Sequence, residues 1–268
     1  MFRLTREVRF AVNADAAADA AQLAGPPANA YAGHPSLVGT GHYFELQVTL
    51  AGAALDARSQ YLRNIKDVDD AVRRLAVPVV AAHVRAGHHP GGHLIARLFA
   101  VLRDAWPGAA LDRLRLNLTP YLAWERLALE PDTMVRLSQT FEFAAAHRLH
   151  NPALSDADNR AAFGKCNNPL GHGHNYQVQV TLAGEPDARG VLVDVPAFER
   201  TVAETVIGRF DHKHLNLETA EFRDTIPSVE NIAKAIYALL KPHFATGPGR
   251  LASVTVWETP KTWCEYAE

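Results

Sequence analysis

The chain has little cysteine, no excess of either charge and no long hydrophobic run. Its two cysteines, Cys166 and Cys264, cannot form a disulfide framework, so each is a packed core residue or a chemically active thiol. With 27 Lys and Arg against 29 Asp and Glu, no positive excess is available to neutralise a phosphate backbone, and we expect no nucleic-acid partner. No apolar run approaches the roughly 20 residues that span a bilayer. Because charged side chains are frequent in the first nine positions, we expect no signal peptide, a cytoplasmic location and no membrane partner.

The amino-acid composition is that of a folded protein with a substantial core. The 268 residues are 48% hydrophobic and 21% charged, which excludes a mainly disordered or collagen-like chain. This length favours two domains of about 130 residues each over one large domain. The unusual feature is the presence of 13 histidines, because imidazole is the commonest metal ligand and a proton carrier near neutral pH.

An internal repeat divides the chain into two halves. The segment FELQVTLAG at 44–52 is similar to YQVQVTLAG at 176–184, and the last six positions of the two segments are identical. The offset is 132 residues, and flanking segments match in nearly the same register. We therefore predict a tandem duplication with a joint near 130–134, where proline and aspartate interrupt the apolar periodicity. The predicted domains are 1–132 and 133–268.

The second half predicts two strands, two helices and two further strands. Apolar residues alternate in the first two strands as they do when one face of a sheet is buried. Asp194 and Ser228 are typical helix N-caps, and the apolar residues after each of them repeat at helical spacing. The strands are predicted at residues 139–145, 176–182, 251–258 and 262–266.

This order defines an α+β fold class, with a four-stranded antiparallel sheet in each half and both helices on one face of it. The edge strands of such a small sheet would be exposed to solvent. We therefore expect the antiparallel sheets to join edge to edge into an oligomeric β-barrel.

Three histidines of the second half have the spacing of a metal site. His172 and His174 are two residues apart, so their imidazoles point to the same face of a strand. His147 ends the preceding predicted strand and is placed to lie opposite them. Three imidazoles with a fourth position open are the ligand set of a catalytic zinc ion rather than of a closed structural site. The alternative is a group of surface loop histidines without a metal.

Other chemically active side chains leave several interpretations open. Cys166 is a fourth zinc ligand, a core thiol, or a thiolate made reactive by a neighbouring cation. Asp211 and His212 form either an orienting carboxylate with a proton carrier or a polar turn between helices. Glu258 ends an apolar strand, where a carboxylate is paired, binds a ligand or is simply exposed. Cys264 has no ligand-like neighbours and is predicted to be a packed or edge thiol.

Together these residues resemble the 6-pyruvoyltetrahydropterin synthase and 6-carboxytetrahydropterin synthase family, which has the tunnelling fold. The resemblance covers essentially all of residues 137–268. It rests on five motifs in order, FEFAAAH (141–147), GKCNNPLGHGHNY (164–176), FDHKHLN (210–216), SVENIA (228–233) and WET (257–259). The resemblance implies a zinc site formed by His147, His172 and His174. It further implies catalytic roles for Cys166, Asp211 and His212, and binding of the pterin ring by Glu258.

The resemblance also implies a reaction. The family's substrate is 7,8-dihydroneopterin triphosphate, so we expect a zinc-dependent lyase of pterin or queuosine-type biosynthesis that eliminates triphosphate. The implied thiolate of Cys166 takes a carbon-bound proton, and His212, held by Asp211, relays protons. The five residues between Cys166 and His172 are more similar to the pyruvoyl-forming type than to carboxy-forming bacterial enzymes. Because both products start from the same substrate, this spacing indicates the substrate better than the product.

The first half departs from this pattern. At the positions of His147, His172 and Cys166 the repeat places Ala14, Thr40 and His34, and only His42 remains at a predicted ligand position. One imidazole cannot hold a catalytic zinc ion, so we predict a degenerate tunnelling-fold domain that acts as a structural partner. A second cluster, at His88, His89 and His93, is predicted to be a polar loop rather than a metal site.

Two other functions are alternatives to the zinc lyase. One is a pterin-binding or regulatory protein that keeps the fold without turnover, and the other is a zinc enzyme such as a GTP cyclohydrolase, whose ligands include cysteines. The family builds a barrel from three units and stacks two barrels. For a tandem chain this implies a homotrimer in which three second halves form one barrel, so that the Asp211–His212 pair faces the cysteine of a neighbouring chain.

Overall fold

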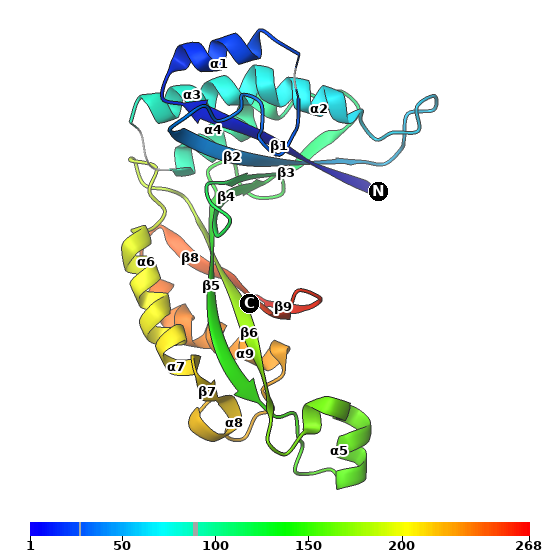
Figure 1. Ribbon diagram of the computed structural model, residues 1–268, viewed down its shortest axis with the longest axis vertical. Helices are drawn as coiled ribbons and strands as arrows, with labels where there is room; N and C mark the ends of the chain where they lie inside the picture. Colours follow the sequence, from blue (N-terminus) through cyan, green and yellow to red (C-terminus); the bar gives the residue numbers. More distant parts are fainter. Residues whose placement is uncertain (27, 88–90) are drawn as a thin grey trace. The chain divides into compact units, whose positions relative to one another are not determined.

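The computed structural model describes residues 1–26, 28–87 and 91–268. The chain divides into two compact units (Figure 1). Unit 1 contains Met1–Ser138 and the segment Gly184–Leu192, and unit 2 contains Gln139–Ala183 and Val193–Glu268. The segment 184–192 follows a strand of the second half but packs with the first, since Gly92 donates its backbone N–H to the carbonyl of Gly190.

Unit 1 contains an antiparallel sheet in the strand order β1-β2-β3-β4. Phe10 of β1 lies opposite Phe44 of β2, and both side chains are buried because apolar residues of these strands face the helices. The strands are β1 Phe2–Asn13, β2 Gly41–Gly52, β3 Ala110–Asn117 and β4 Leu122–Leu127.

The helices of unit 1 lie on one face of these strands (Figure 1). Asn64 caps the second helix by accepting a hydrogen bond from the backbone N–H of Lys66, and a π-helical segment, η1, interrupts the helix about two turns later. The helical elements are α1 Ala16–Leu23, α2 Ile65–Ala71, η1 Val72–Ala76, α3 Val77–Arg85 and α4 Gly91–Leu102.

Unit 2 has the strand order β5-β6-β8-β9. The four strands predicted from the sequence are confirmed, and β5 and β6 are longer than predicted. The sheet also contains β7, a two-residue strand that pairs in parallel with β5 and that the sequence did not predict. The strands are β5 Val135–His147, β6 His172–Gly184, β7 Lys213–His214, β8 Gly249–Thr259 and β9 Thr262–Tyr266.

The predicted N-caps of unit 2 are confirmed. Asp194 accepts a hydrogen bond from the N–H of Ala197, and Ser228 accepts one from the N–H of Asn231. The helical elements are α5 Asp156–Phe163, η2 Gly164–Asn167, α6 Val195–Val202, the π-helical η3 Ala203–Ile207, α7 Gly208–Phe210, α8 Leu215–Glu218, α9 Val229–Leu240 and η4 Lys241–Phe244. The sequence did not predict α5 and α8, which lie in the two segments that carry the cysteine and the Asp-His motif.

An aromatic core supports the start of β6. Phe143 of β5 stacks on Tyr176 of β6, with ring centroids 4.9 Å apart and an interplanar angle of 18°, and it also contacts Phe210. Phe198 of α6 meets Phe141 edge to face at 5.8 Å. These rings fix the ends of β5 and β6, which is where the predicted metal ligands lie.

The single chain does not form a closed barrel. Within the described residues, β1 and β9 each pair with another strand on one side only, so the closed barrel stays a prediction about the assembly. A search of the described helices for one with the length and apolar character of a membrane span found none.

Candidate active site

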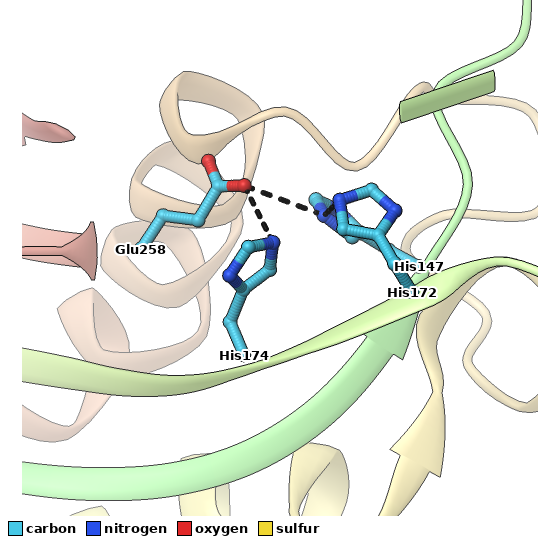
Figure 2. A group of neighbouring side chains, drawn as sticks. All are labelled: His147, His172, His174 and Glu258. Atoms are coloured by element: carbon cyan, nitrogen blue, oxygen red, sulfur yellow. Dashed lines mark hydrogen bonds and ion pairs between the residues drawn. The ribbon is translucent and has the colours of Figure 1, made fainter. Parts of the chain in front are cut away.

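The three predicted metal ligands converge in unit 2. His147 is the last residue of β5, and His172 and His174 alternate at the start of β6, so all three imidazoles lie on the same side of the strand pair (Figure 2). Glu258, near the end of β8, points into the same group. One nitrogen or oxygen atom from each of these four residues lies within 4.8 Å of the others. The four residues predicted from separate sequence motifs therefore lie together in one cluster of potential ligands.

The spacing of the ring nitrogens fits a metal ion. His147 Nε2 and His172 Nε2 lie 3.1 Å apart. Ligand atoms on a tetrahedral zinc ion, with Zn–N bonds of about 2.0–2.1 Å, are separated by about 3.3 Å. The two imidazoles are thus placed as two ligands of one ion without any need for the chain to rearrange.

A backbone carbonyl sets the orientation of His147. Its Nδ1 lies 2.7 Å from the carbonyl oxygen of Pro227, which only accepts hydrogen bonds, so Nδ1 carries the proton and donates it. This leaves Nε2 with its lone pair facing His172 and Glu258. The His147 side chain is fully buried, so the orientation is held on all sides. Sequence reasoning missed Pro227, because a backbone carbonyl has no residue signature.

The other two imidazoles have buried ring nitrogens that face the cluster or lack a partner. Among the described residues, His172 Nδ1 makes no hydrogen bond, and His174 Nε2 has Glu258 Oε1 at 2.8 Å as its ion-pair partner. Burial lowers the pKa of both His172 and His174, so the neutral form that binds metals predominates at neutral pH. Three neutral imidazoles beside a carboxylate are the donor set of a divalent ion such as zinc, and the residues present fit that ion.

Glu258 lies closer to the imidazoles than the sequence indicated. Its Oε1 is 2.8 Å from His174 Nε2 and 3.5 Å from His147 Nε2. Contact with His147 lowers the pKa of Glu258, although burial opposes this effect, so this side chain is a carboxylate. It is placed either to complete the ligand group or to accept hydrogen bonds from a ligand bound beside it.

Cys166 lies outside this ligand group. The residue belongs to η2, and its carbonyl accepts a hydrogen bond from the N–H of Leu149. Asn167 Nδ2 donates to the carbonyl of Leu149 at 2.8 Å and closes the same loop. The thiol is half-buried, and the described potential ligands that gather around one point do not include it. This placement favours a reactive or packed thiol over a fourth ligand.

Asp211 and His212 form an ion pair held against β5. Asp211 Oδ2 lies 2.8 Å from His212 Nδ1, while Asp211 Oδ1 accepts the N–H of Ala144 at 2.9 Å. The hydrogen bond from Ala144, followed by the one from His212, lowers the pKa of Asp211. The His212 side chain remains 83% exposed, and its backbone has a φ of 56°. The pair therefore presents an oriented imidazole beside Ala144, which lies three residues before the ligand His147.

Tyr176 is a further side chain at this site to which the sequence gave no role. Its ring meets His147 and His174 edge to face, at 6.0 and 5.6 Å, and it is fully buried. Burial, followed by the nearby Glu258 and Cys166, raises the pKa of its hydroxyl, which has no hydrogen-bond partner among the described residues. The sequence signal for this role was the alternation of Tyr176 with His172 and His174, which places the three side chains on one face of the strand.

Within the described residues, the first half has no comparable group of potential metal ligands. The potential metal ligands that cluster within the described ranges all come from unit 2. His93 lies in the first turn of α4 and is exposed, so its prediction as part of a polar loop was wrong. His88 and His89 lie outside the described residues.

The site thus combines a group of three histidines and one glutamate that can hold a metal ion with an oriented Asp-His pair, on an α+β fold. Residues 136–268 match the family model of 6-pyruvoyl tetrahydropterin synthase. The human 6-pyruvoyl tetrahydrobiopterin synthase is 39% identical over 125 residues, which are 46% of this chain and 85% of the human protein. The Drosophila melanogaster protein of the same name is 38% identical over 131 residues, 48% of this chain and 77% of its own length.

A solved structure, that of Caenorhabditis elegans 6-pyruvoyl tetrahydropterin synthase, is 38% identical, covers 50% of this chain and 96% of its own, and has a TM-score of 0.48. A less similar relative is the 6-carboxy-5,6,7,8-tetrahydropterin synthase of Haemophilus influenzae, 27% identical over 50% of this chain and 100% of its own length. The chain belongs to the 6-pyruvoyl tetrahydropterin synthase family, and it is an enzyme of the lyase class.

Proposed function

We propose that the chain is a zinc-dependent lyase that acts on 7,8-dihydroneopterin triphosphate and eliminates triphosphate, with 6-pyruvoyltetrahydropterin or 6-carboxytetrahydropterin as the product. The observation that carries this proposal is the cluster of His147, His172 and His174, in which the buried His147 is locked by the Pro227 carbonyl with Nε2 facing the other ligands. The relatives named above, with either product in their names, support the substrate class.

Each side chain of the site has a part in this reaction. A bound zinc ion supplies Lewis acidity toward the hydroxyls of the substrate side chain, which makes the adjacent C–H more acidic. Cys166, as a thiolate, accepts that proton. His212, oriented by Asp211 at 2.8 Å, carries protons between the substrate side chain and the pterin ring. Glu258 accepts hydrogen bonds from the amino and ring N–H groups of the pterin, which sets specificity.

The reaction balances without an added oxidant or reductant. Elimination breaks the carbon–oxygen bond to triphosphate, and the proton taken from the neighbouring carbon returns to the ring system. The side-chain carbons are oxidised to carbonyl groups as the pterin ring is reduced, so electrons move only within the molecule. A 6-carboxy product has two fewer side-chain carbons than a 6-pyruvoyl product, so its formation consumes one water molecule and releases the two carbons as acetaldehyde. Mass analysis of the pterin product therefore separates the two outcomes.

Triphosphate release from 7,8-dihydroneopterin triphosphate tests the proposal directly. The metal-loaded protein should release triphosphate, and Cys166→Ala should lower the rate by about 10²–10⁴-fold because a general base is lost. The variant should keep its metal, since Cys166 lies outside the ligand group. If wild-type protein binds the substrate but releases no triphosphate, the alternative of a pterin-binding or regulatory protein is correct. Loss of metal from Cys166→Ala would instead make the thiol a ligand.

The assembly and location belong to the same proposal. We assign residues 1–132 to a degenerate tunnelling-fold domain and 133–268 to the catalytic one, in a cytoplasmic homotrimer of tandem chains whose second halves form one barrel. In that arrangement the Asp211–His212 pair serves the cysteine of a neighbouring chain. Mixing Cys166→Ala and Asp211→Ala chains should then restore part of the activity after subunit exchange. An active monomer, or no recovery after verified exchange, would contradict this assembly.

A further inference from the structure

Two sequence motifs of unit 2 contain an asparagine to which the proposed reaction gives no part. Asn216 ends the motif FDHKHLN (210–216), and Asn231 lies in SVENIA (228–233). Asn216 makes hydrogen bonds to the residue that follows His147, and Asn231 makes one to the turn that contacts the His147 ring. Both asparagines therefore act on the backbone around a single buried imidazole.

Asn216 fixes the backbone immediately after His147. β5 ends at His147, so strand pairing no longer holds the chain beyond this residue. Arg148 donates its N–H to Asn216 Oδ1 at 2.8 Å, and Asn216 Nδ2 donates to the Arg148 carbonyl at 3.0 Å. One side-chain amide thus satisfies both backbone groups of Arg148, as a neighbouring strand would. The backbone of His147 is thereby held from its C-terminal side.

Asn231 fixes the turn whose carbonyl orients the His147 ring. The Ile226 carbonyl accepts two hydrogen bonds, from the backbone N–H of Ser228 at 2.8 Å and from Asn231 Nδ2 at 2.9 Å. The N–H of Ser228 and the carbonyl of Pro227 belong to the same planar peptide unit and point in opposite directions. Holding that N–H toward Ile226 therefore aims the Pro227 carbonyl at His147 Nδ1, 2.7 Å away.

The same turn is tied to the start of α9. The N–H of Asn231 donates to Ser228 Oγ at 3.4 Å, and the N–H of Ile232 donates to the Ser228 carbonyl at 2.9 Å. Pro227 is buried, and its ring fixes φ at about −65°. The turn therefore has little freedom to move away from His147, and the orientation of this ligand depends on contacts with the first turn of α9.

These contacts bear on the affinity of the cluster for a metal ion. The Pro227 carbonyl keeps the proton of His147 on Nδ1 and so leaves the lone pair of Nε2 for the cluster. Without a fixed carbonyl, the imidazole would also adopt the other tautomer and other orientations, and binding a metal ion would have to reverse both. Groups that hold a ligand imidazole in place typically change metal affinity by about 10- to 100-fold.

We propose that Asn216 and Asn231 are positioning residues that raise the metal affinity of the cluster by holding His147 from two sides. Asn216 holds the backbone of the ligand, and Asn231 holds the carbonyl that orients its ring. The inference rests on the proposed function for the presence of zinc, but it does not depend on the substrate or on the reaction. It can therefore be tested without turnover.

The first test measures the zinc affinity of the full-length protein by competition with a chromophoric chelator. Asn216→Ala and Asn231→Ala should each weaken zinc binding by about 10- to 100-fold. Asn29→Ala in unit 1 is the matched control, since Asn29 accepts the N–H of Arg9 at 3.0 Å and donates to the Glu7 carbonyl at 2.8 Å. This control loses the same two kinds of hydrogen bond to a strand and should leave the zinc affinity unchanged.

Nitrogen NMR of the isotopically labelled, metal-free protein gives a second readout that does not depend on zinc. Wild type should show His147 with its proton on Nδ1, and the signal is identified by its loss in His147→Ala. In Asn231→Ala it should change to that of a mixture of both tautomers, whereas a purely structural role of Asn231 would leave it unchanged. If Asn231→Ala fails to fold, Asn231→Gln keeps a polar amide but displaces it by one methylene group, and it should weaken zinc binding several-fold.

The outcomes separate this inference from the proposed function. Unchanged zinc affinity in a folded variant would overturn the assignment of that asparagine, and so would an equal loss in Asn29→Ala. If zinc binding depends on Asn216 and Asn231 but wild type releases no triphosphate from dihydroneopterin triphosphate, the positioning role stands and the proposed lyase function fails. If wild type is an active zinc enzyme and neither substitution changes zinc binding, only the positioning role fails. A wild-type protein that binds no zinc would contradict both.

Discussion

The two units contain closely similar helices and hairpins, but only one of them has a ligand cluster. Six residues of β2, Gln47–Gly52, recur in β6 as Gln179–Gly184. In each unit a π-helical segment continues the first helix after the hairpin, Val72–Ala76 after α2 in unit 1 and Ala203–Ile207 after α6 in unit 2. The shared features are those that build the hairpin and its helices. They therefore specify the fold and not the chemistry.

The difference in metal ligands between the units lies at the end of each hairpin. In unit 1, His42 and Phe44 have ring centroids 6.2 Å apart, and in unit 2 the corresponding His174 and Tyr176 are 5.6 Å apart. The aromatic support is thus present in both units. The additional ligands are absent from unit 1 because Ala14 and Thr40 replace two imidazoles there. Substitutions at exposed strand ends remove a metal site at little cost to the core.

The largest expected effect is the loss of metal from one unit only. His172→Ala should reduce bound zinc from about one equivalent per chain to less than a tenth, because two imidazoles and a carboxylate bind far less tightly than the full set. His42→Ala, at the corresponding hairpin of unit 1, is the control and should leave the metal content unchanged. Metal analysis after dialysis measures both. Two equivalents in wild type, with one retained in His172→Ala, would show that unit 1 also binds metal.

The strands and caps of unit 2 were predictable because each has a local signature. Alternating apolar residues mark β5 and β6, and Asp194 and Ser228 each precede a run with helical spacing. His172 and His174 were predictable for the same reason, since a spacing of two on a strand places side chains on one face, and His147 was predictable as the end of the preceding strand. These features depend on neighbours in the sequence.

Features that depend on distant backbone contacts could not be predicted. The Pro227 carbonyl that orients His147 lies 80 residues away. The parallel pairing of β7 with β5 involves only two residues, too few for a periodic pattern. The approach of Glu258 to His174 depends on how β8 is placed beside β6, which side-chain type alone does not determine.

Restoring ligands to unit 1 should remove the difference in metal binding between the two units. Ala14 and Thr40 line one cavity of about 630 Å³ together with His42, so these three positions converge there. The double variant Ala14→His, Thr40→His should bind additional zinc, approaching a second equivalent at micromolar concentrations of the ion. Its ligands lack the fixed orientation of His147, so this site should be the weaker one. Metal titration with a chromophoric chelator measures it, and Ala14→Ser, Thr40→Ser is the control. No added metal in a folded double variant would mean that the hairpin alone does not specify the ligand geometry.

A smaller effect is expected at the aromatic that supports the ligands. Tyr176 has a buried hydroxyl without a partner, and unit 1 has phenylalanine at the corresponding position, Phe44. Tyr176→Phe should leave the free energy of unfolding unchanged or raise it by up to about 1 kcal/mol, because an unsatisfied polar group is removed. Tyr237→Phe is the matched control, since the Tyr237 hydroxyl donates to the Leu251 carbonyl, and it should lose about 0.5–1.5 kcal/mol. Urea unfolding of the metal-free proteins gives both values. A clear loss of stability in Tyr176→Phe would show that its hydroxyl has a partner.

The smallest effects are expected where the two units are most alike. Asn64 caps α2 through the N–H of Lys66 at 3.0 Å, and Asp194 caps α6 through the N–H of Ala197 at 2.7 Å. Replacing either cap with alanine should destabilise its helix by about 1 kcal/mol. The loss should be slightly larger for Asp194→Ala, because a carboxylate also interacts with the positive end of the helix dipole. Hydrogen exchange of amides in the first turn reports each helix separately, with Asp70→Ala on the exposed face of α2 as the control. Small losses in both helices, with no change in bound metal, would confirm that the shared framework folds independently of the ligand cluster. A loss of zinc in Asp194→Ala would instead link the cap to the site.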